Sequence, residues 1–257
     1  MFFDSKDKFF NYLKFMEDSG IIKKIGVGSQ GICYLDFRNN KVYKIFHQFF
    51  DEEDEEFYIK YQKEDILRFS HIVNDTFIWS NDVIVVGSEI IGYISDYKNA
   101  KSLYKINPLK INLNTFSKFV RNVYKDIRII SDNGILTFDM MYNILYSNKG
   151  FFIIDHDDYS YFNSSNDYLY IKNCDNFNYE IMYFLVDNYF NEFVSSYSDL
   201  NNMYERKRID INEFITLFRK HLSEYVGRDI IRLEDASCCF NKNKVKEIRY
   251  VRNYFNR

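Results

Sequence analysis

Apolar residues near the start of the chain recur at the spacing of a helix. Over residues 5–18 one side of the predicted helix is apolar, with Ser5 placed to cap its start and Gly20 following its end. The residues that form this apolar side are Phe9, Phe10, Leu13 and Met16. The chain is therefore expected to begin with a helix.

The next apolar runs are short and predict strands. Residues 21–25, 32–37 and 41–46 are rich in β-branched and aromatic residues, with a glycine-rich stretch in the first gap and the turn sequence "NN" in the second. The order of strand, glycine loop, strand, tight turn and strand predicts an antiparallel meander.

Beyond the meander the pattern returns to a helix and then to strands. The stretch 51–72 opens on acidic residues, which suit a helix N-terminus, and its apolar residues have the spacing of an inward stripe. The stretches 76–80 and 82–97 predict two or three further strands. Residues 21–97 are therefore expected to form a small sheet interrupted by one helix, whose inward stripe consists of Tyr58, Tyr61, Ile66 and Phe69.

The pattern changes character in the second part of the chain. A helical stretch at 113–131 is followed by a hairpin, with "NILYS" and "FFIID" as strands and "NKG" as the turn, and then by helical stretches at 178–195 and 212–225. The sequence thus predicts an α+β protein with a strand-rich part over residues 1–97 and a mostly helical part over residues 98–257.

Composition and charge exclude several classes of protein. Hydrophobic residues make up 46% and charged residues 28% of the 257, which is typical of a globular protein and not of a disordered one. The formal charge of -3 gives no footprint for nucleic acid, and the chain shows neither a secretory signal nor an apolar run that reaches a membrane span. Four cysteines without metal-ligand spacing suit a reducing compartment. We therefore expect a cytoplasmic protein with no nucleic-acid or membrane partner.

The glycine cluster is the first candidate for chemistry. Gly26, Gly28 and Gly31 fit the pattern G-x-G-x-x-G. In a dinucleotide-binding fold this pattern joins a strand to a helix, whereas here a strand follows it. A glycine hairpin between antiparallel strands is the arrangement that covers the nucleotide phosphates in protein kinases. A plain hairpin turn is the alternative.

Lys44 lies on the third strand of the predicted meander, where a kinase lysine ion-pairs with the α- and β-phosphates of ATP. In a chain with 34 Lys and Arg, a surface strand lysine is the alternative. The following helix should supply a carboxylate that holds this lysine. Glu64 is the first choice, and Glu56 and Asp65 compete with it.

Asp139, Asn143 and Asp155 form the strongest pattern further along the chain. Phosphoryl transfer needs a group that accepts or orients the proton of the attacking hydroxyl, which suits Asp139, and oxygen ligands for Mg²⁺. Asn143 and Asp155 are candidates for these ligands, brought together by the hairpin between them. A single Asp or Asn in a loop is more often a turn-former. The ordered set, from the glycine loop to Asp155, favours phosphoryl transfer.

These motifs resemble those of the protein-kinase-like superfamily, which includes the eukaryotic-type Ser/Thr protein kinases and the aminoglycoside and choline phosphotransferases. "IGVGSQGICY" resembles the glycine-rich loop, "VYKIF" the lysine strand, "GILTFDMMYNIL" the catalytic loop and "FIIDHDD" the strand that ends at the metal-binding Asp. The similarity covers roughly residues 20–160. It implies a bilobal fold, with a small antiparallel-sheet N-lobe carrying one main helix, a larger mostly helical C-lobe, and ATP with Mg²⁺ bound in the cleft.

The chain also departs from this family. "TFD" at residues 137–139 stands where the family has His-Arg-Asp or His-Gly-Asp, His156 follows Asp155, and Asp157 is placed to share or take over the metal. The resemblance implies an ATP-dependent kinase, first of all a divergent Ser/Thr protein kinase that phosphorylates a protein hydroxyl. Two alternatives stay open: a kinase of small-molecule alcohols, and an inactive nucleotide-binding module, or pseudokinase.

Overall fold

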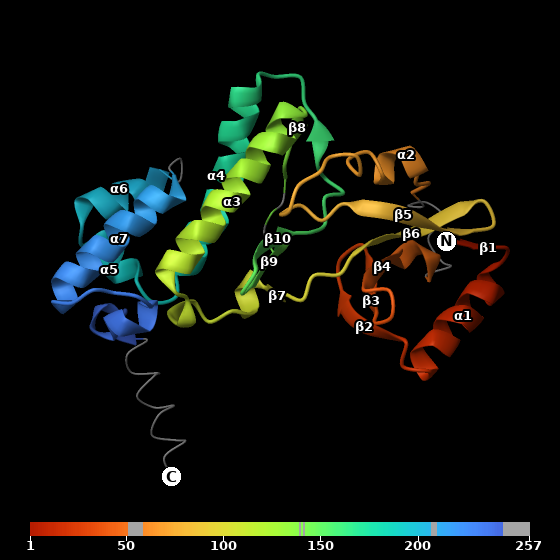
Figure 1. Cartoon of the computed structure of the whole chain (residues 1–257), viewed down its shortest axis with the longest axis horizontal. Helices are drawn as coiled ribbons and strands as arrows, with labels where there is room; N and C mark the ends of the chain where they lie inside the picture. Colours follow the sequence, from red (N-terminus) through yellow and green to blue (C-terminus); the bar gives the residue numbers. More distant parts are fainter. Residues whose placement is uncertain (51–58, 139, 141, 207–209, 244–257) are drawn as a thin grey trace, which may run out of the picture. The chain divides into compact units, whose positions relative to one another are not determined.

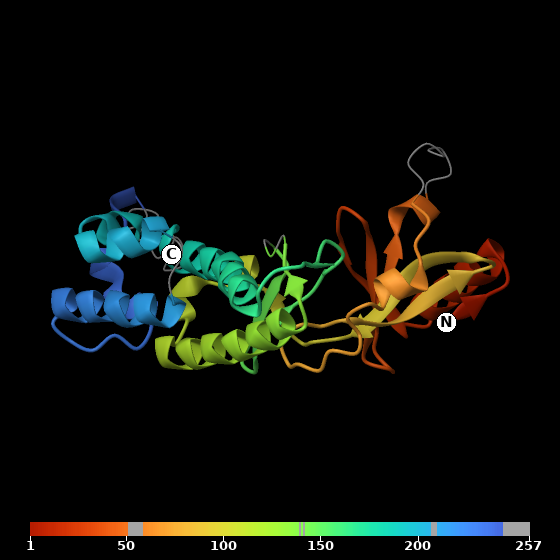
Figure 2. The ribbon, with the colours of Figure 1, turned by 90° about the horizontal axis from the view of Figure 1, so that it is seen from above.

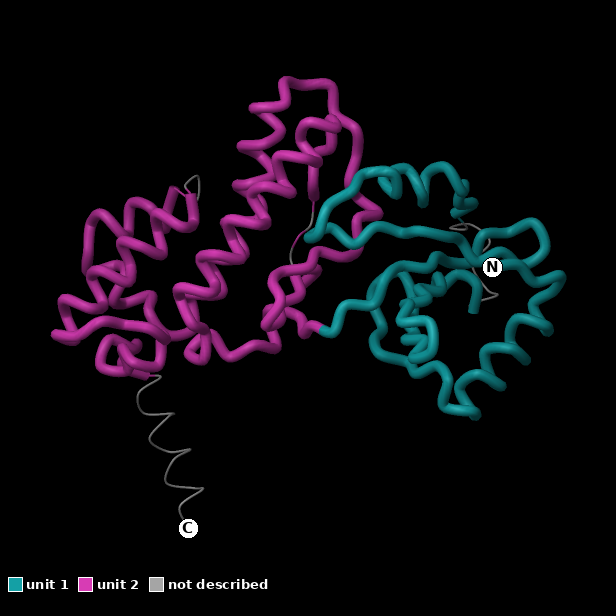
Figure 3. The backbone as a smooth tube through the Cα atoms, viewed as in Figure 1, with its two compact units in different colours: residues 1–99 teal, residues 100–257 magenta. Residues whose placement is uncertain are grey.

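The computed structural model describes residues 1–50, 59–138, 140, 142–206 and 210–243. The chain divides into two compact units, residues 1–99 and residues 100–257 (Figure 3). The first unit contains a six-stranded sheet, and the second is mostly helical with small sheets. The prediction of an α+β protein is therefore confirmed.

The sheet of the first unit runs in the order β1-β5-β6-β4-β3-β2. Its strands are β1 (Phe2–Phe3), β2 (Ile22–Val27), β3 (Gly31–Asp36), β4 (Lys41–Phe46), β5 (Ser80–Val86) and β6 (Glu89–Asp96). β2, β3 and β4 pair antiparallel, which confirms the predicted meander. Of the stretch 76–80, β5 takes in only Ser80.

The sheet is mixed, so the expectation of a purely antiparallel sheet is wrong. β1 pairs parallel with β5, with Phe2 opposite Val85 and Phe3 opposite Val86. The N-terminal ammonium group of Met1 adds a hydrogen bond to the carbonyl of Val83 (2.8 Å). A strand of two residues is too short to show a period of two in the sequence.

Helix α1 (Lys6–Asp18) packs against one face of this sheet (Figure 1). As predicted, Ser5 caps it, since the Ser5 side chain accepts a hydrogen bond from the backbone N–H of Lys8. The core on this face includes Tyr43 and Ile45 of β4. Because successive strand residues point to opposite faces, Lys44 points to the face away from α1.

The helix predicted over residues 51–72 is wrong in its described part. Helix α2 spans only Lys63–Ile66, which leaves α1 as the main helix of this unit. At Ile59 both backbone groups bond to the side-chain amide of Gln48, whose Nε2 donates to the Ile59 carbonyl (2.7 Å) and whose Oε1 accepts from the Ile59 N–H (3.1 Å). A residue whose backbone groups are taken in this way does not join a helix.

The predicted inward stripe of this segment is realised only in part and without a long helix, since Ile66 is half-buried and two other members pack on aromatic rings. Tyr61 stacks on Phe46 of β4 with ring centroids 4.1 Å apart, and Phe69 is buried against Trp79. Tyr58 lies outside the described residues. Through Tyr61 this segment therefore packs on the sheet face that carries Lys44.

The second unit is built around two long helices, α3 and α4, which lie side by side (Figures 1 and 2). Its helices are α3 (Leu113–Asp132), α4 (Asn166–Val186), α5 (Asn191–Ser195), α6 (Ser198–Arg206) and α7 (Ile211–Val226). Its short strands are β7 (Lys101–Ser102), β8 (Ile135–Leu136), β9 (Ile144–Ser147), β10 (Gly150–Ile153) and β11 (Ser160–Tyr161). The predictions of α3, α7 and the β9–β10 hairpin are confirmed.

The helix predicted over residues 178–195 has different bounds in the structure. α4 begins at Asn166, where Ser165 accepts a hydrogen bond from the N–H of Tyr168 as an N-cap, and a separate helix, α5, follows. The first half of α4 buries the polar residue Asn173, so the apolar pattern misses it. The sequence analysis also missed α6.

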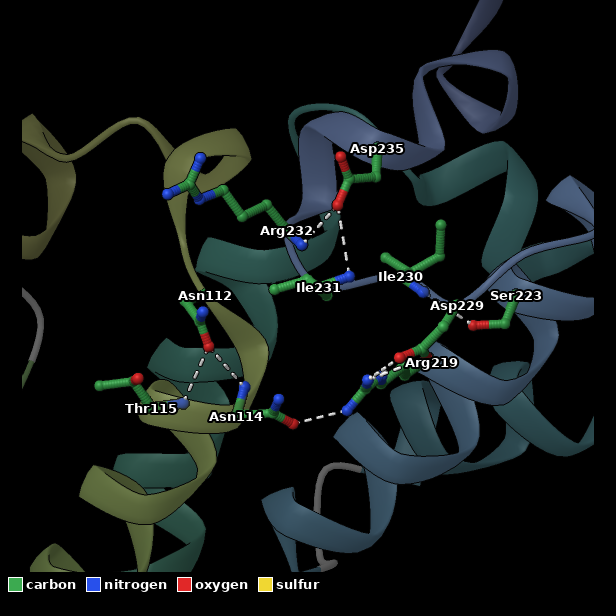
Figure 4. A network of polar contacts seen from close by, with 10 residues as sticks. All are labelled: Asn112, Asn114, Thr115, Arg219, Ser223, Asp229, Ile230, Ile231, Arg232 and Asp235. Atoms are coloured by element: carbon green, nitrogen blue, oxygen red, sulfur yellow. Dashed lines mark hydrogen bonds and ion pairs between the residues drawn. The ribbon is translucent and has the colours of Figure 1, made fainter.

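A polar network joins the start of α3 to α7 and to the segment after it (Figure 4). Asn112 caps α3 by accepting from the N–H groups of Asn114 and Thr115 (both 3.1 Å). The guanidinium group of Arg219 donates to Asn114 (2.5 Å) and to both carboxylate oxygens of Asp229 (2.9 and 2.7 Å). These contacts hold the start of α3 to α7 and to the segment that follows α7.

Within the described residues, no helix combines the length and the apolar character that crossing a membrane requires.

Candidate functional site

The glycine cluster forms the tight turn between β2 and β3. The N–H of Gly28 donates to the carbonyl of Gly31 (2.9 Å). A Cβ atom on Gly31 would lie 2.3 Å from the carbonyl oxygen of Ile45, so β3 approaches β4 this closely only with glycine there. At Gly26 and Gly28 a Cβ atom would meet nothing closer than 3.9 Å. Gly31 therefore has a packing role, whereas Gly26 and Gly28 leave the exposed hairpin open to an approaching group.

Lys44 lies on β4, directly opposite Cys33 of β3. Only 5% of its surface is exposed, so the alternative of a surface lysine is excluded. Its ammonium nitrogen donates a hydrogen bond to Oε1 of Gln30 (2.7 Å) and lies 5.4 Å from the centre of the Tyr93 ring. Lys44 thus lies within hydrogen-bonding distance of the glycine turn that contains Gln30.

The turn is also held from the far end of β4. The Nε2 atom of His47 lies 2.8 Å from the carbonyl oxygen of Gly28, and the backbone N–H of His47 donates to the carbonyl of Gln30 (2.9 Å). The sequence analysis did not single out Gln30 or His47. Only its position inside the glycine motif could have indicated a role for Gln30 from the sequence.

The structure does not bring Glu64 to Lys44. Glu64 is exposed in α2, and the described residues contain no ion pair between the two side chains. Asp65 is exposed as well, and Glu56 lies outside the described residues. Gln30, a neutral residue of the turn, accepts a hydrogen bond from the Lys44 ammonium group.

In the second unit, the β9–β10 hairpin brings Asn143 close to Asp155 along the backbone. Ile144 pairs with Ile153, and the N–H of Ile154 then donates to the carbonyl of Asn143 (3.1 Å). Asp155 is the next residue and has a positive φ of 59°. A non-glycine residue in this region is uncommon, and such residues cluster at functional sites.

The remaining candidates of this unit are placed as follows. Asp139 lies outside the described residues. Asp157 is half-buried in the turn after Asp155. Among the described residues, no group of three or more His, Cys, Asp or Glu side chains lies close enough to hold a metal ion. Mg²⁺ commonly takes one or two protein oxygens and completes its shell with water and phosphate, so Asn143 and Asp155 fit this ion better than a metal that needs a full protein cage.

A buried polar network fixes the segment that leads to Asp139. Thr137 is fully buried, and both its backbone N–H and its hydroxyl donate to Oδ1 of Asn173 on α4 (2.8 and 2.9 Å). Nδ2 of Asn173 donates in turn to Ser131 and to the carbonyl of Ile135 (2.9 Å each). Asn176 adds a bond to the carbonyl of Thr137 (2.7 Å). Thr137 stands where the superfamily that the motifs resemble has a histidine. Its N–H, hydroxyl and carbonyl groups are all hydrogen-bonded to α4, so this threonine has a structural role.

A hollow of about 590 Å³ lies elsewhere on the second unit, between α3 and α7. It is lined by Arg121, Arg219 and Lys220 among others, but Asp229 and Asn114 already bind the Arg219 guanidinium group. None of the residues predicted for phosphoryl transfer lines it. We assign it no function.

A scan against protein-family models finds no match for the chain, and a search of curated protein sequences finds none either. Function is therefore argued from the residues and their geometry.

Proposed function

We propose that the protein is an ATP-dependent phosphotransferase of the protein-kinase-like superfamily, with a protein hydroxyl group as acceptor. The observation that carries the proposal is the buried lysine beside the glycine turn, with 2.7 Å between Lys44 Nζ and Gln30 Oε1. Lysine is rarely buried, because removing an ammonium group from water is costly. A site that binds phosphate oxygens gives such a lysine a function.

The first unit supplies the groups that bind the nucleotide. Gly26 and Gly28 let the backbone of the turn approach the phosphates, and Lys44 binds the α- and β-phosphates as a point charge. The open space at both glycines supports this assignment.

The second unit supplies the groups that act on the transferred phosphoryl group. Asn143 and Asp155 are the residues that would hold Mg²⁺, which neutralises charge on the phosphate when it is bound. Asp139 orients the acceptor hydroxyl. The hydrogen bonds that Thr137 donates to Asn173 and accepts from Asn176 hold the preceding segment in place. Catalysis of this kind rests on positioning and electrostatic stabilisation.

One observation favours the second candidate function, an inactive nucleotide-binding module. Glu64, the carboxylate expected to hold Lys44, is exposed, and Lys44 bonds to Gln30. A protein that binds ATP with Mg²⁺ but consumes none of it would fit this alternative.

Transfer of labelled γ-phosphate from ATP to a mixture of protein acceptors tests the proposal. Asp155→Asn removes the charge while asparagine tolerates the positive φ of this position, so the variant should fold normally. We expect its phosphotransfer to fall by about 100-fold or more.

Asp132→Asn, an exposed position at the end of α3, is the matched control and should keep full activity. Undiminished transfer by Asp155→Asn would contradict the metal assignment. Binding of ATP by the unaltered protein without any transfer would favour the inactive module.

A further inference from the structure

Two adjacent cysteines lie at the end of a 3₁₀ helix (Leu233–Cys239) in the second unit. The sulfur atoms of Cys238 and Cys239 are 4.0 Å apart, and one thiol donates a weak hydrogen bond to the other. Cys238 is exposed, whereas only 6% of the surface of Cys239 is exposed. An accessible thiol therefore lies directly beside a buried one.

The chain is held on both sides of this pair. Near the start of the 3₁₀ helix, the Asp235 carboxylate accepts a hydrogen bond from the N–H of Arg232 (2.8 Å; Figure 4). After the pair, the ring of Phe240 packs on the rings of Tyr189 and Phe190, with centroids 5.3 and 5.2 Å apart. These contacts fix the backbone that carries the two thiols.

The other two cysteines lie on separate elements, Cys33 on β3 and Cys174 on α4, and both are half-buried. Burial raises the pKa of the Cys174 thiol to about 12, and burial together with the neighbouring Cys238 raises the pKa of the Cys239 thiol to about 12 as well. Both thiols therefore stay protonated at neutral pH. Exposure makes Cys238 the thiol that a dissolved oxidant reaches first.

We propose that Cys238 and Cys239 form a reversible redox site, in which a peroxide converts the two adjacent thiols into a disulfide. This inference does not depend on the proposed phosphotransfer. It stands on the distance between the two sulfur atoms and on the exposure of one of them.

The oxidation takes two steps. Hydrogen peroxide transfers an oxygen atom to the sulfur of Cys238, so that the O–O bond breaks, a sulfenic acid forms and one water leaves. The sulfur of Cys239 then attacks this sulfur: the S–S bond forms, the S–O bond breaks, and the hydroxyl group leaves with the thiol proton as a second water. The two thiols lose two electrons in all, and the peroxide is reduced to two waters. The protonated state of Cys239 slows the second step, but the short distance makes that step intramolecular.

A disulfide between adjacent residues is readily reduced. Adjacent Cα atoms are about 3.8 Å apart, closer than the separation of about 4.4 to 6.8 Å that is usual in disulfides. Such a departure from the usual geometry strains the bond and makes it more reducible. The dithiol is therefore the resting state in the presence of cellular thiols, and peroxide shifts the pair to the disulfide.

The test is peptide mass spectrometry on the full chain after treatment with hydrogen peroxide. Cleavage after Arg232 and Lys242 releases residues 233–242, which contain both cysteines of the pair and neither of the other two. We expect this peptide to lose about 2 Da, the mass of two hydrogen atoms, and reduced glutathione to restore the original mass.

Cys239→Ala separates the two steps, because its Cys238 can form the sulfenic acid but not the disulfide. We expect labelling of Cys238 by dimedone, a reagent for sulfenic acids, to be at least about 10-fold stronger in this variant than in the unaltered protein. Cys238→Ser, at an exposed position, should show neither the disulfide nor the label. Cys174→Ala is the control and should form the disulfide as the unaltered protein does.

Thermal unfolding checks that each variant is folded, and if Cys239→Ala is not, the unaltered protein and Cys238→Ser decide the matter. The proposal is overturned if the unaltered protein keeps both thiols after peroxide treatment. It is overturned equally if peroxide joins Cys238 to a second molecule of the protein instead of to Cys239.

Discussion

The two units hold their candidate residues by different means. In the first unit, backbone pairing fixes the positions of the candidate residues, since β3 pairs with β4 at Gly31 and Lys44. Glycine is needed at residue 31 because the carbonyl oxygen of Ile45 lies too close for a side chain. In the second unit the β9–β10 hairpin brings Asn143 close to Asp155, but the segment that leads to Asp139 is held by side chains of a single helix, since Asn173 and Asn176 of α4 bind Thr137. A strand ladder tolerates most side-chain changes, whereas a buried side-chain network depends on each of its members.

This difference predicts that the largest loss of stability follows the loss of a single amide in the second unit. Asn173→Leu removes the partner of the Thr137 N–H and hydroxyl and of the Ile135 carbonyl, all in buried surroundings. We expect the free energy of unfolding to fall by about 4 kcal/mol, measured by denaturant titration.

Asn176→Leu serves as the graded comparison for this network. Asn176 bonds mainly to the Thr137 carbonyl, so its replacement should cost only about 1 kcal/mol. If both substitutions lower the free energy of unfolding equally, Asn173 contributes no more to the network than Asn176 does.

The first unit should be most sensitive at Gly31. In Gly31→Ala the added methyl group meets the Ile45 carbonyl at 2.3 Å, and we expect a loss of about 2 kcal/mol from the strain in the ladder. Gly26→Ala has open space and should change the free energy of unfolding by less than about 0.5 kcal/mol. Thermal unfolding of the pair checks this, and a loss at Gly26 as large as that at Gly31 would refute the backbone account.

A smaller loss of stability is expected when the hydrogen bonds of the buried Asp36 carboxylate in the first unit are removed. Burial by itself would raise the pKa of Asp36, but hydrogen bonds from the Tyr43 hydroxyl, from Asn39 and from two backbone N–H groups outweigh it, and the pKa lies below its usual value. A carboxyl with a lowered pKa stabilises the fold above its ordinary pKa of about 3.9, and this stability is lost as the pH falls through the lowered value.

Tyr43→Phe removes one of these hydrogen bonds. We expect a loss of about 1 kcal/mol at neutral pH that shrinks as the pH is lowered below about 4, measured by urea titration at several pH values. A loss that grows on acidification would contradict the role of Asp36.

The sequence predicted those elements whose pattern repeats over many residues. The meander, the long apolar face of α3 and the β9–β10 hairpin with its "NKG" turn all have such patterns. It failed where one contact between distant residues decides the local structure. Gln48 takes both backbone groups of Ile59 and prevents the predicted helix there, and the two residues of β1 are too few to show a period.

The candidate residues divide in the same way. The positions of Gly31 and Lys44 follow from strand order, which the sequence shows. The hydrogen bond between Lys44 and Gln30 depends on the shape of the turn, and the exposed position of Glu64 depends on the short helix α2; neither follows from strand order. The anchoring role of Asn173 depends on a contact between α4 and a segment far from it in the chain, and residue types alone do not reveal it.

The most direct test of the central claim, that Lys44 binds nucleotide phosphate, is a calorimetric titration with ATP and Mg²⁺. The unaltered protein is compared with Lys44→Met and with Lys41→Met, a lysine of the same strand that pairs with Asp96 at the surface. We predict saturable binding with the same Kd for the unaltered protein and Lys41→Met, and at least about 10-fold weaker binding for Lys44→Met. Equal affinity in all three proteins, or no binding by the unaltered protein, would contradict the account.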